Sequence, residues 1–559
     1  MKKLSLIIFN SLLIFNMCNA QSLEYHWVSY LTSTSGNTRS YAESISKDVQ
    51  GNINVLGMYD SNGETYINGD SIPELSMLGS DDIYVKKIDA NGELIWANKI
   101  GNFIYGSPGE IANDESGNIY ITAFYSGDLE LSINGAIEVF SEGTSFKSTI
   151  LIKISPNGEI IWAKNFNSYR TPILVKNDEI YLGLNFADEV NLGNSQIIQS
   201  NGGTDILLVK LSTNGSVIYY KQLGSNSTIT ISSIDIDQNL NLYTTGYYFN
   251  TIGFQTNNGF KEFISEGEND IYVMSLTNSF DIVWLNSIGT NGEDQGNDIE
   301  FDQNNIYLIG NYYYDIIEEE SSYSTGQDMC VLKYNINGDL IWSKFIYGVS
   351  PDNGEAISVI NNTIFIGGKF EDYVDFDPSE DQVIYWGNFP FKNSFFSALD
   401  LDGNYKFAWV FGHGSYNGVR DIITSEDEIY LCGSFGGITD FDPTFEYENL
   451  TSQSAESSFV LRLSSSSLLT NINHLDFNIE NISIYPNPTN KYFKFHQNID
   501  LNEIIEVKLY SNLGKLLKTY RNNPSNIFSL PEESLDGIYF LEIIYKNSEK
   551  NLLKIIVNK

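Results

Sequence analysis

Apolar residues recur along this chain in short runs of strand length, each directly after a polar or glycine-containing pair. One nine-residue pattern of this kind occurs seven times between residues 51 and 435. A tight turn followed by an apolar and aromatic run is typical of a buried β-strand. The copies are GNINVLGMY at 51–59, GNIYITAFY at 117–125, DEIYLGLNF at 178–186, LNLYTTGYY at 240–248, NNIYLIGNY at 304–312, NTIFIGGKF at 362–370 and DEIYLCGSF at 427–435.

A second element, made of two apolar runs around an Asn-Gly or similar turn, follows these copies after a polar stretch. This combination predicts a β-hairpin. The first hairpin is DDIYVKKIDANGELIW at 81–96, and related segments lie at 148–162, 204–219, 269–284, 327–342 and, with a longer turn, 393–411. A first strand is expected before each nine-residue pattern, at 44–48, 109–113, 173–176, 231–236, 297–301, 356–360 and 419–423.

Tryptophan closes most of the hairpins. Six of the seven tryptophans take this position, and Tyr219 replaces tryptophan in one copy. Trp27 belongs to a strand at 25–31 without a hairpin partner before it, whereas the strand at 457–464 lacks an aromatic strand after it. Pairing the two would complete a seventh four-stranded unit and remove two exposed sheet edges. We therefore predict an all-β fold with a seven-bladed β-propeller closed by the N-terminal strand; a solenoid is the alternative.

The repeat resembles a known family. An apolar-aromatic strand, a hairpin with an Asn-Gly turn and a closing tryptophan are together similar to the bacterial seven-bladed β-propeller repeat family over about residues 40–465. The resemblance implies this fold and an extracellular or surface location. It implies no reaction, because functions on such scaffolds depend on loops that are added to them.

The last part of the chain has a different pattern and a different charge. Short strands with alternating apolar and polar residues from Asn481 onward predict a small immunoglobulin-like β-sandwich. This segment has 10 Lys and Arg against 8 Asp and Glu, whereas the whole chain has a formal charge of -39. We predict a signal peptide at 1–20, the propeller at 21–468, a linker at 469–480 and a C-terminal domain at 481–559.

Four blocks of this tail resemble the type A sorting domain of the type IX secretion system. They are ISIYPNPTNKYFKF at 482–495, VKLYSNLGKLLKTY at 507–520, LDGIYFLEI at 535–543 and KIIVNK at 554–559. The resemblance implies that the outer-membrane secretion machinery is a partner, that the tag is removed, and that the protein is released or attached at the cell surface. The motif residues carried over are Pro486, Asn487, Pro488, Gly514, Gly537, Tyr539 and Lys554. A second fused binding module is the alternative.

The N-terminus has the regions of a secretory signal peptide. Lys2 and Lys3 precede an apolar run, and small residues before Gln21 suggest cleavage after Ala20. The run is too short to span a bilayer, so we expect export through the periplasm and no transmembrane segment in the mature chain. Cys330 and Cys432 then remain in different repeats, and we predict that both are free and buried.

The charge of -39 changes the list of expected partners. Nucleic acid and anionic membranes are disfavoured, because both need a basic protein surface. Two loops, VDFDPSEDQ at 374–382 and ITDFDPTFEYEN at 438–449, concentrate acidic residues. Asp375, Asp377, Asp440 and Asp442 have hard oxygen ligands that suit calcium, but Asp-Pro also initiates turns. Both interpretations stay open, and calcium is the one cofactor considered.

Catalytic chemistry has little support in the sequence. The four histidines are scattered, and His413 alone lies in a loop that could face a ligand. Acids of the inner strands, Glu110, Asp298, Glu355 and Asp421, could line a channel mouth as solvated residues or as a hydrolytic or lyase pair. We expect an exported, non-enzymatic binding or adhesion scaffold for a glycan or protein. The alternative is a secreted polysaccharide- or protein-degrading enzyme with its site at the propeller mouth.

Overall fold

The structure is a computed structural model, and it describes residues 23–34, 38–60, 64–75, 82–101, 105–141, 148–193, 196–315, 325–387, 391–414, 417–444, 448–465, 484–485, 491–495, 504–511, 516–521, 527–531, 537–546 and 550–557. The chain forms two compact units, Met1–Ser466 and Ser467–Lys559. Within the described ranges the regular structure is all β-strand apart from a short 3-10 helix, η3 (Pro73–Leu75). In those ranges no helix has the length and apolar character needed to cross a membrane.

Seven sheets of the first unit share a four-stranded antiparallel core within the described residues. Sheets 1 to 3 contain β2 (Arg39–Lys47), β3 (Ile53–Asp60), β6 (Asp82–Ile88) and β7 (Leu94–Ile100); β8 (Tyr105–Asn113), β9 (Ile119–Ser126), β12 (Ser148–Ile154) and β13 (Ile160–Phe166); and β14 (Ile173–Lys176), β15 (Glu179–Phe186), β18 (Asp205–Ser212) and β19 (Val217–Leu223). Sheets 4 to 6 contain β20 (Thr228–Ile236), β21 (Leu242–Thr256), β22 (Gly259–Leu276) and β23 (Ile282–Ile288); β24 (Gln295–Asp302), β25 (Asn305–Asp315), β26 (Thr325–Asn335) and β27 (Leu340–Gly348); and β28 (Asn353–Ile360), β29 (Thr363–Phe370), β32 (Lys392–Asp400) and β33 (Tyr405–Gly414). Sheet 7 contains β34 (Gly418–Ser425), β35 (Glu428–Phe435), β38 (Ser457–Ser465) and β1 (Leu23–Ser33).

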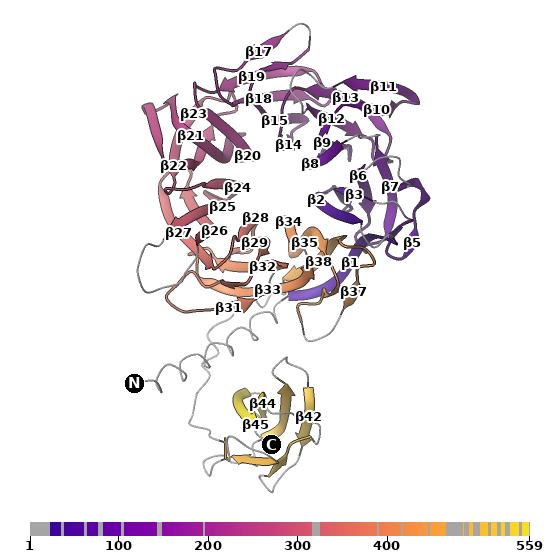
Figure 1. Cartoon of the computed structure of the whole chain (residues 1–559), viewed down its shortest axis with the longest axis vertical. Coiled ribbons are helices and arrows are strands. Elements are labelled where there is room, and N and C mark those ends of the chain that lie inside the picture. Colours follow the sequence, from indigo (N-terminus) through magenta and orange to yellow (C-terminus); the bar gives the residue numbers. More distant parts are fainter. Residues whose placement is uncertain are drawn as a thin grey trace. The chain divides into compact units, whose positions relative to one another are not determined.

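These sheets stand side by side around a central opening, and the first strand of each lies innermost (Figure 1). The arrangement is β-propeller-like. In sheet 7 the outer strand is β1, which pairs antiparallel with β38 from Leu23↔Ser465 to Leu31↔Ser458. A side-chain hydrogen bond joins the same two segments, because His26 Nε2 lies 2.8 Å from Ser464 Oγ although 438 residues separate them.

The closing aromatic residue of one sheet contacts the last turn of the next. Trp27, Trp96, Trp162, Trp284 and Trp342 each donate from Nε1 to a backbone oxygen of that turn, at 2.9 to 3.2 Å. Gly338 in such a turn has φ +87, and a Cβ added there would come within 2.7 Å of the Trp284 ring. Glycine is therefore needed at this position both for the positive φ and for the close approach of the Trp284 ring. In sheet 4 the turn carries Phe280 with φ 58 instead, and Tyr219 packs on it with centroids 5.6 Å apart.

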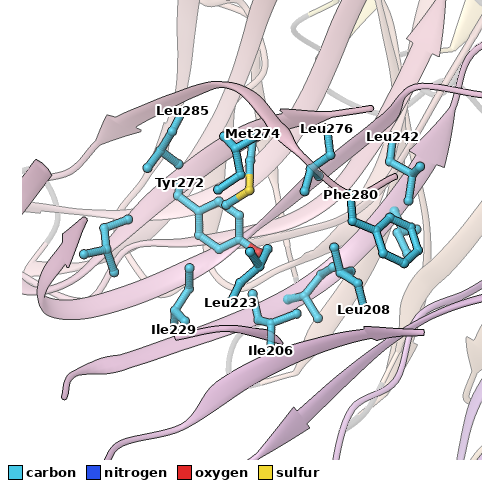
Figure 2. Close-up of a cluster of buried hydrophobic side chains, with 14 of the residues drawn as sticks. Ile206, Leu208, Leu223, Ile229, Leu242, Tyr272, Met274, Leu276, Phe280 and Leu285 are labelled. Carbon is cyan, nitrogen blue, oxygen red and sulfur yellow. The ribbon is translucent and has the colours of Figure 1, made fainter. Parts of the chain in front are cut away.

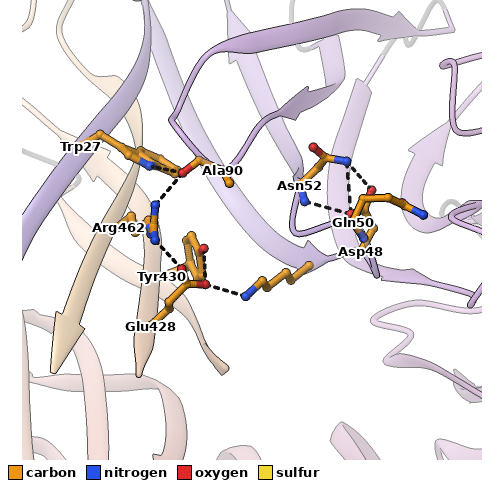
Figure 3. A network of polar contacts seen from close by, with 9 residues as sticks. Trp27, Asp48, Gln50, Asn52, Ala90, Glu428, Tyr430 and Arg462 are labelled. Atoms are coloured by element: carbon orange, nitrogen blue, oxygen red, sulfur yellow. Dashed lines mark hydrogen bonds and ion pairs between the residues drawn. The ribbon is translucent and has the colours of Figure 1, made fainter. Parts of the chain in front are cut away.

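The seam between sheets 7 and 1 contains a connected polar network (Figure 3). Trp27 Nε1 and Arg462 Nη1 both donate to the Ala90 oxygen, at 2.9 and 2.6 Å. Arg462 also pairs with Glu428, whose other carboxylate oxygen lies 2.6 Å from Lys47 Nζ. These contacts join β38, β35, β2 and the last turn of sheet 1, so the seam is held by side chains as well as by strand pairing.

Apolar side chains fill the space between adjacent sheets. In Figure 2, Ile206, Leu208 and Leu223 of sheet 3 face Tyr272, Met274 and other residues of sheet 4. All of these side chains are buried. Neighbouring sheets cover both faces of each sheet, so its second and third strands are apolar almost throughout. This explains the continuous apolar runs in the sequence.

Short hairpins connect the second and third strands of several sheets. They are formed by β4 (Thr65–Ile67) and β5 (Asp70–Ser71), β10 (Asp128–Ile133) and β11 (Ala136–Ser141), β16 (Glu189–Asn191) and β17 (Ile197–Gln199), β30 (Tyr373–Asp375) and β31 (Ile384–Trp386), and β36 (Ile438–Asp440) and β37 (Asn449–Thr451). Two of them extend the outer edge of the preceding sheet, because β4 pairs with β1 and β30 pairs with β27.

The second unit has two sheets within the described residues. One contains β39 (Ile484–Tyr485), β40 (Tyr492–Phe495) and β43 (Phe528–Ser529), and the other contains β42 (Leu516–Arg521), β41 (Ile504–Ser511), β44 (Gly537–Tyr545) and β45 (Lys550–Val557). Its core includes Phe493 and Phe528, whose rings stack with centroids 5.2 Å apart, together with Val507 and Leu541. This unit therefore has a hydrophobic core of its own.

Candidate functional site

Several innermost strands carry one extra residue at a recurring place. β2, β20, β24, β28 and β34 have a bulge there, and the bulged residues are Glu43, Ser232, Asn297, Glu355 and Arg420. A bulge redirects its side chain. The charged ones come from sheets 1, 6 and 7 and form ion pairs: Arg420 Nη1 lies 2.9 Å from Glu43 Oε2, and Glu355 pairs with Lys369.

Acids on the innermost strands accept hydrogen bonds from the backbone of a neighbouring sheet. Buried backbone N–H groups need acceptors, and these carboxylates provide them where two sheets meet. The bonds run from Ile173 N to Glu110 Oε2 at 2.9 Å, from Phe301 N to Asp235 Oδ2 at 2.6 Å, from Ile357 N to Asp298 Oδ2 at 2.9 Å and from Ile45 N to Asp421 Oδ2 at 2.8 Å. The acids therefore connect successive sheets.

The environment of these acids shifts their pKa values. Burial raises the pKa of Asp421 to about 7, and the nearby Asp298 carboxylate adds to the rise. Burial also raises the pKa of Glu110 well above its ordinary value, with further contributions from Asp298 and Asp421. Glu355 differs: burial raises its pKa, but Lys369 and Arg420 outweigh that effect and the net pKa is lowered. Three of the four inner acids named from the sequence thus interact with one another.

A carboxyl group with a pKa near 7 can hold or release a proton at neutral pH. Asp421 is such a group, and it also accepts from Ser44 Oγ at 3.0 Å. Its Oδ2 oxygen therefore already has two donors from sheet 1. The arrangement suits a link between sheets. Transfer of the Asp421 proton is the one chemical step that it leaves open.

The acidic loops named from the sequence form the same turn twice. In the β30–β31 loop, Asp375 Oδ1 accepts from the backbone N–H of Asp377 at 3.2 Å and of the residue eight positions on at 2.7 Å. Asp440 does the same in the β36–β37 loop, with Asp442 at 3.1 Å and the eighth residue at 2.9 Å. Asp377 and Asp442 each accept from the N–H two residues further on.

These four carboxylates thus fix loop conformation. Within the described ranges no group of three or more His, Cys, Asp and Glu side chains could hold a metal ion. Calcium at either loop stays a prediction that the geometry of the carboxylates alone does not require.

The β30–β31 hairpin also carries an aromatic pair that the repeat analysis did not single out. Tyr373 and Trp386 lie opposite each other across the two strands, with ring centroids 4.9 Å apart and an interplanar angle of 48°. Trp386 is 67% exposed. In the β36–β37 hairpin the same positions hold Ile438 and Thr451. One signal was available in the sequence, since Trp386 is the one tryptophan of seven outside the closing position.

The structure places the other named residues as follows. Cys330 and Cys432 are free and buried in sheets 5 and 7, so that prediction is confirmed. His413 is in β33, but its side chain lies outside the described residues, as do Pro486, Asn487, Pro488 and Gly514. Gly537 begins β44, Tyr539 is buried in the same strand, and Lys554 lies in β45 opposite Phe540.

Comparison with known proteins identifies the tail. Residues 483–558 match the secretion system C-terminal sorting domain. The chain is also 22% identical over 348 residues to an uncharacterized WD repeat-containing protein of Acanthamoeba polyphaga mimivirus, covering 50% of this chain and 25% of that protein. It thus spans about a quarter of the length of the curated relative that it matches.

Similar solved structures have low identity. Drosophila semaphorin 2a shares 8% identity with a TM-score of 0.38, covering 94% of this chain and 98% of that one. The phage phi92 endosialidase shares 9% with a TM-score of 0.35, covering 95% and 88%. A member of the DUF4221 family from Bacteroides vulgatus shares 14% with a TM-score of 0.26, covering 62% and 93%. The C-terminal sorting domain shows that the chain is sorted by the type IX secretion system, exported and then secreted or attached to the cell surface.

Proposed function

We propose that this protein is an exported, non-enzymatic binding or adhesion scaffold, a seven-bladed β-propeller that contacts a glycan or protein outside the cell. The blade count is supported by the seven described sheets of one design, and closure by the pairing of β1 with β38. Location is given by the sorting domain. Loops on a rigid scaffold are the common place for recognition, so the hairpins at the second-to-third strand connections are the proposed binding elements.

The observation that carries this proposal is that the acids of the innermost strands and the exposed residues of the strand connections have different roles. Acids of the innermost strands accept hydrogen bonds between sheets, as Asp298 and Asp421 do. The second-to-third strand connections of five sheets instead expose large apolar residues to solvent, and exposed connections on a rigid scaffold are common places for recognition. Their exposed fractions are 72% for Ile137, 49% for Ile197, 63% for Phe260, 67% for Trp386 and 60% for Ile438.

The alternative is a secreted polysaccharide- or protein-degrading enzyme that acts at the propeller mouth. The raised pKa of Asp421, about 7, favours it, because such a group can act as a general acid near neutral pH. Glu110 and Asp298 lie near enough to influence one another and would be its partners. The hydrogen bonds from the backbone to all three count against this role.

One screen separates the two functions. The exported chain is tested on glycan and protein arrays, and every bound ligand is then incubated with the protein and analysed for cleavage by mass spectrometry. Binding without product supports the scaffold. Product that disappears in Asp421→Asn would overturn it in favour of the enzyme, since asparagine can still accept the Ile45 N–H bond but cannot supply a proton at neutral pH.

The proposal includes the domain limits. The propeller occupies 21–468, a linker 469–480, and an immunoglobulin-like β-sandwich 481–559. The separation of contacts after Ser466 and the separate hydrophobic core of the second unit support these limits. Limited proteolysis should cut first within the linker and leave two resistant fragments; a first cut inside either domain would move the boundary.

A further inference from the structure

Trp386 lies where the repeat does not require a tryptophan. Six tryptophans occupy the closing position of a hairpin, where five of them hold a turn of the next sheet. Trp386 instead lies at the end of β31, the outermost strand of its six-stranded sheet, and is 67% exposed. Tryptophan is seldom so exposed without a reason, because its large apolar surface is costly in water.

The residues around Trp386 lie on one face of β27, β30 and β31. Side chains of directly paired residues share a face. Tyr373 pairs with Trp386, and Tyr347 pairs with Asp375 in the next row, so these four residues lie on the same side. Tyr347 is 39% exposed, which extends the aromatic surface toward sheet 5. We call this set the aromatic face.

The opposite side of the hairpin anchors it to the protein. Val374 is fully buried there, and Tyr385 packs against Phe376 with centroids 5.6 Å apart. The Tyr385 hydroxyl donates to the Ala408 backbone oxygen at 2.7 Å. The aromatic face is therefore presented on a fixed backbone, which lowers the entropy lost when a ligand binds.

The β36–β37 hairpin is an internal comparison for this site. Both hairpins have the same strand lengths, the same loop length and the same hydrogen bonds from their Asp residues. They differ at the paired positions, where the first has Tyr373 and Trp386 and the second has Ile438 and Thr451. The aromatic pair is thus not needed to build this hairpin, so a structural explanation for it is weak.

We propose that the aromatic face binds a neutral carbohydrate chain, with the Trp386 ring stacked on the apolar face of a sugar ring and the tilted Tyr373 ring in contact beside it. This inference rests on the proposed binding function and names the ligand class of one hairpin. An open aromatic surface accommodates the apolar C–H face of a sugar ring, whereas an apolar peptide side chain is bound best in an enclosed pocket. Hollows of 220 and 790 Å³ lie elsewhere, among residues of sheets 1 to 3.

Charge selects the kind of glycan. The chain has a formal charge of -39, and Asp375 lies on the aromatic face itself. A polyanionic glycan would be repelled on approach, whereas neutral sugars are unaffected. Hydroxyl groups of a neutral sugar can also donate to a carboxylate oxygen at the rim. We therefore expect neutral chains to bind and polyuronates to bind weakly.

The test uses the exported chain and neutral oligosaccharides of glucose, xylose, mannose, galactose and N-acetylglucosamine, with polygalacturonate as the anionic comparison. The main variant is Trp386→Thr, which introduces the residue that the second hairpin has at this position. Phe249→Ala is the matched control, because Phe249 is an exposed aromatic residue (41%) of β21 where that strand pairs with β20, outside the proposed binding connections. A gain-of-function variant, Ile438→Tyr with Thr451→Trp, transfers the pair to the second hairpin. Circular dichroism checks that each variant is folded.

We expect at least one neutral oligosaccharide to bind, Trp386→Thr to weaken its binding at least about tenfold, and Phe249→Ala to leave its binding unchanged. The transferred pair should raise the number of bound sugars per chain. Equal glycan binding by the protein and Trp386→Thr would overturn this inference and leave the binding function intact. Binding only to protein ligands on the arrays would also overturn it, whereas no binding to any ligand would overturn both proposals.

Discussion

Replacing one buried lysine should stabilise the first unit and change how its stability depends on pH. Lys86 in β6 is fully buried, and its Nζ donates to Ser29 Oγ of β1 at 3.2 Å. Burial lowers its pKa from 10.5 to about 7. The corresponding residues of other repeats, one position before the residue that pairs with the closing aromatic, are Ile152, Val209, Met274 and Leu332, all buried. The variant Lys86→Met therefore introduces a residue that the repeat already accommodates.

The size of the effect follows from the pKa difference. Between about pH 7 and 10 the unfolded chain binds a proton at Lys86 that the folded protein does not, so the stability of the wild type rises with pH in this window. Each pKa unit corresponds to about 1.4 kcal/mol. Below pH 7 the burial of Lys86 therefore lowers the free energy of unfolding of the wild type by roughly 4–5 kcal/mol, which is the penalty for burying this charge. Methionine removes this penalty. Its advantage over lysine should be largest at or below pH 7 and should fall by about 2 kcal/mol by pH 9.

Urea unfolding followed by tryptophan fluorescence measures this, because all seven tryptophans lie in the first unit. Comparing the two chains at each pH cancels the contributions of the many other acids. Lys87→Met is the control: Lys87 Nζ lies 2.7 Å from Asp48 Oδ2, and breaking this buried ion pair should destabilise by about 3–5 kcal/mol. A Lys86→Met chain that is less stable than the wild type at pH 7, or an advantage independent of pH, would refute the reasoning.

Three further outcomes follow from the structure. Gly338→Ala should destabilise the first unit by about 2–4 kcal/mol, because a collision of its Cβ with the Trp284 ring adds about 1–3 kcal/mol to the cost of a positive φ. Gly51→Ala, with a similar φ and nothing within 4 Å, should cost only the φ contribution of about 1 kcal/mol, and equal effects in urea unfolding would contradict the contact. Thiol titration of the exported chain without reductant should find two thiols that react only after denaturation, and none would mean a disulfide between Cys330 and Cys432. Deleting residues 481–559 should leave a folded propeller in the periplasm, and normal secretion of that chain in cell fractionation would disprove the role of the sorting domain.

The repeat pattern located the strands because both faces of each sheet are covered, so buried runs and turn pairs stand out. Each expected first strand overlaps an observed one, from β2 to β34. The links between sheets were beyond the pattern. A bulge sets the direction of the Glu43 and Arg420 side chains, and no local spacing of residues in the sequence predicts that bulge. The partners of Asp421 lie in the first sheet, on residues distant in the sequence, so its role in joining sheets depends on the assembled fold.

The binding surface was harder to anticipate for a similar reason. Tyr373 and Trp386 meet across a loop closed by Asp375, and Tyr347 joins them because β30 extends the outer edge of the preceding sheet. A sequence pattern that treats each repeat separately cannot predict such a contact between repeats. The sequence contained one indication, because Trp386 lies outside the closing position of a hairpin. Its exposed fraction in the structure then shows that it belongs to the surface and not to the core.

Hydrogen exchange of the exported chain tests most directly whether the ring is closed by its first strand. Peptides covering β1 (Leu23–Ser33) should exchange as slowly as those covering β19, the outer strand of sheet 3, and peptides covering β38 (Ser457–Ser465) as slowly as those covering β18, its third strand. Slow exchange of β1 is expected because β1 is hydrogen-bonded to β38 along most of its length and its Trp27 donates to the Ala90 backbone oxygen of the next sheet. If β1 exchanges within seconds, as a frayed terminus does, while β38 has an unprotected outer edge, the closed propeller is wrong.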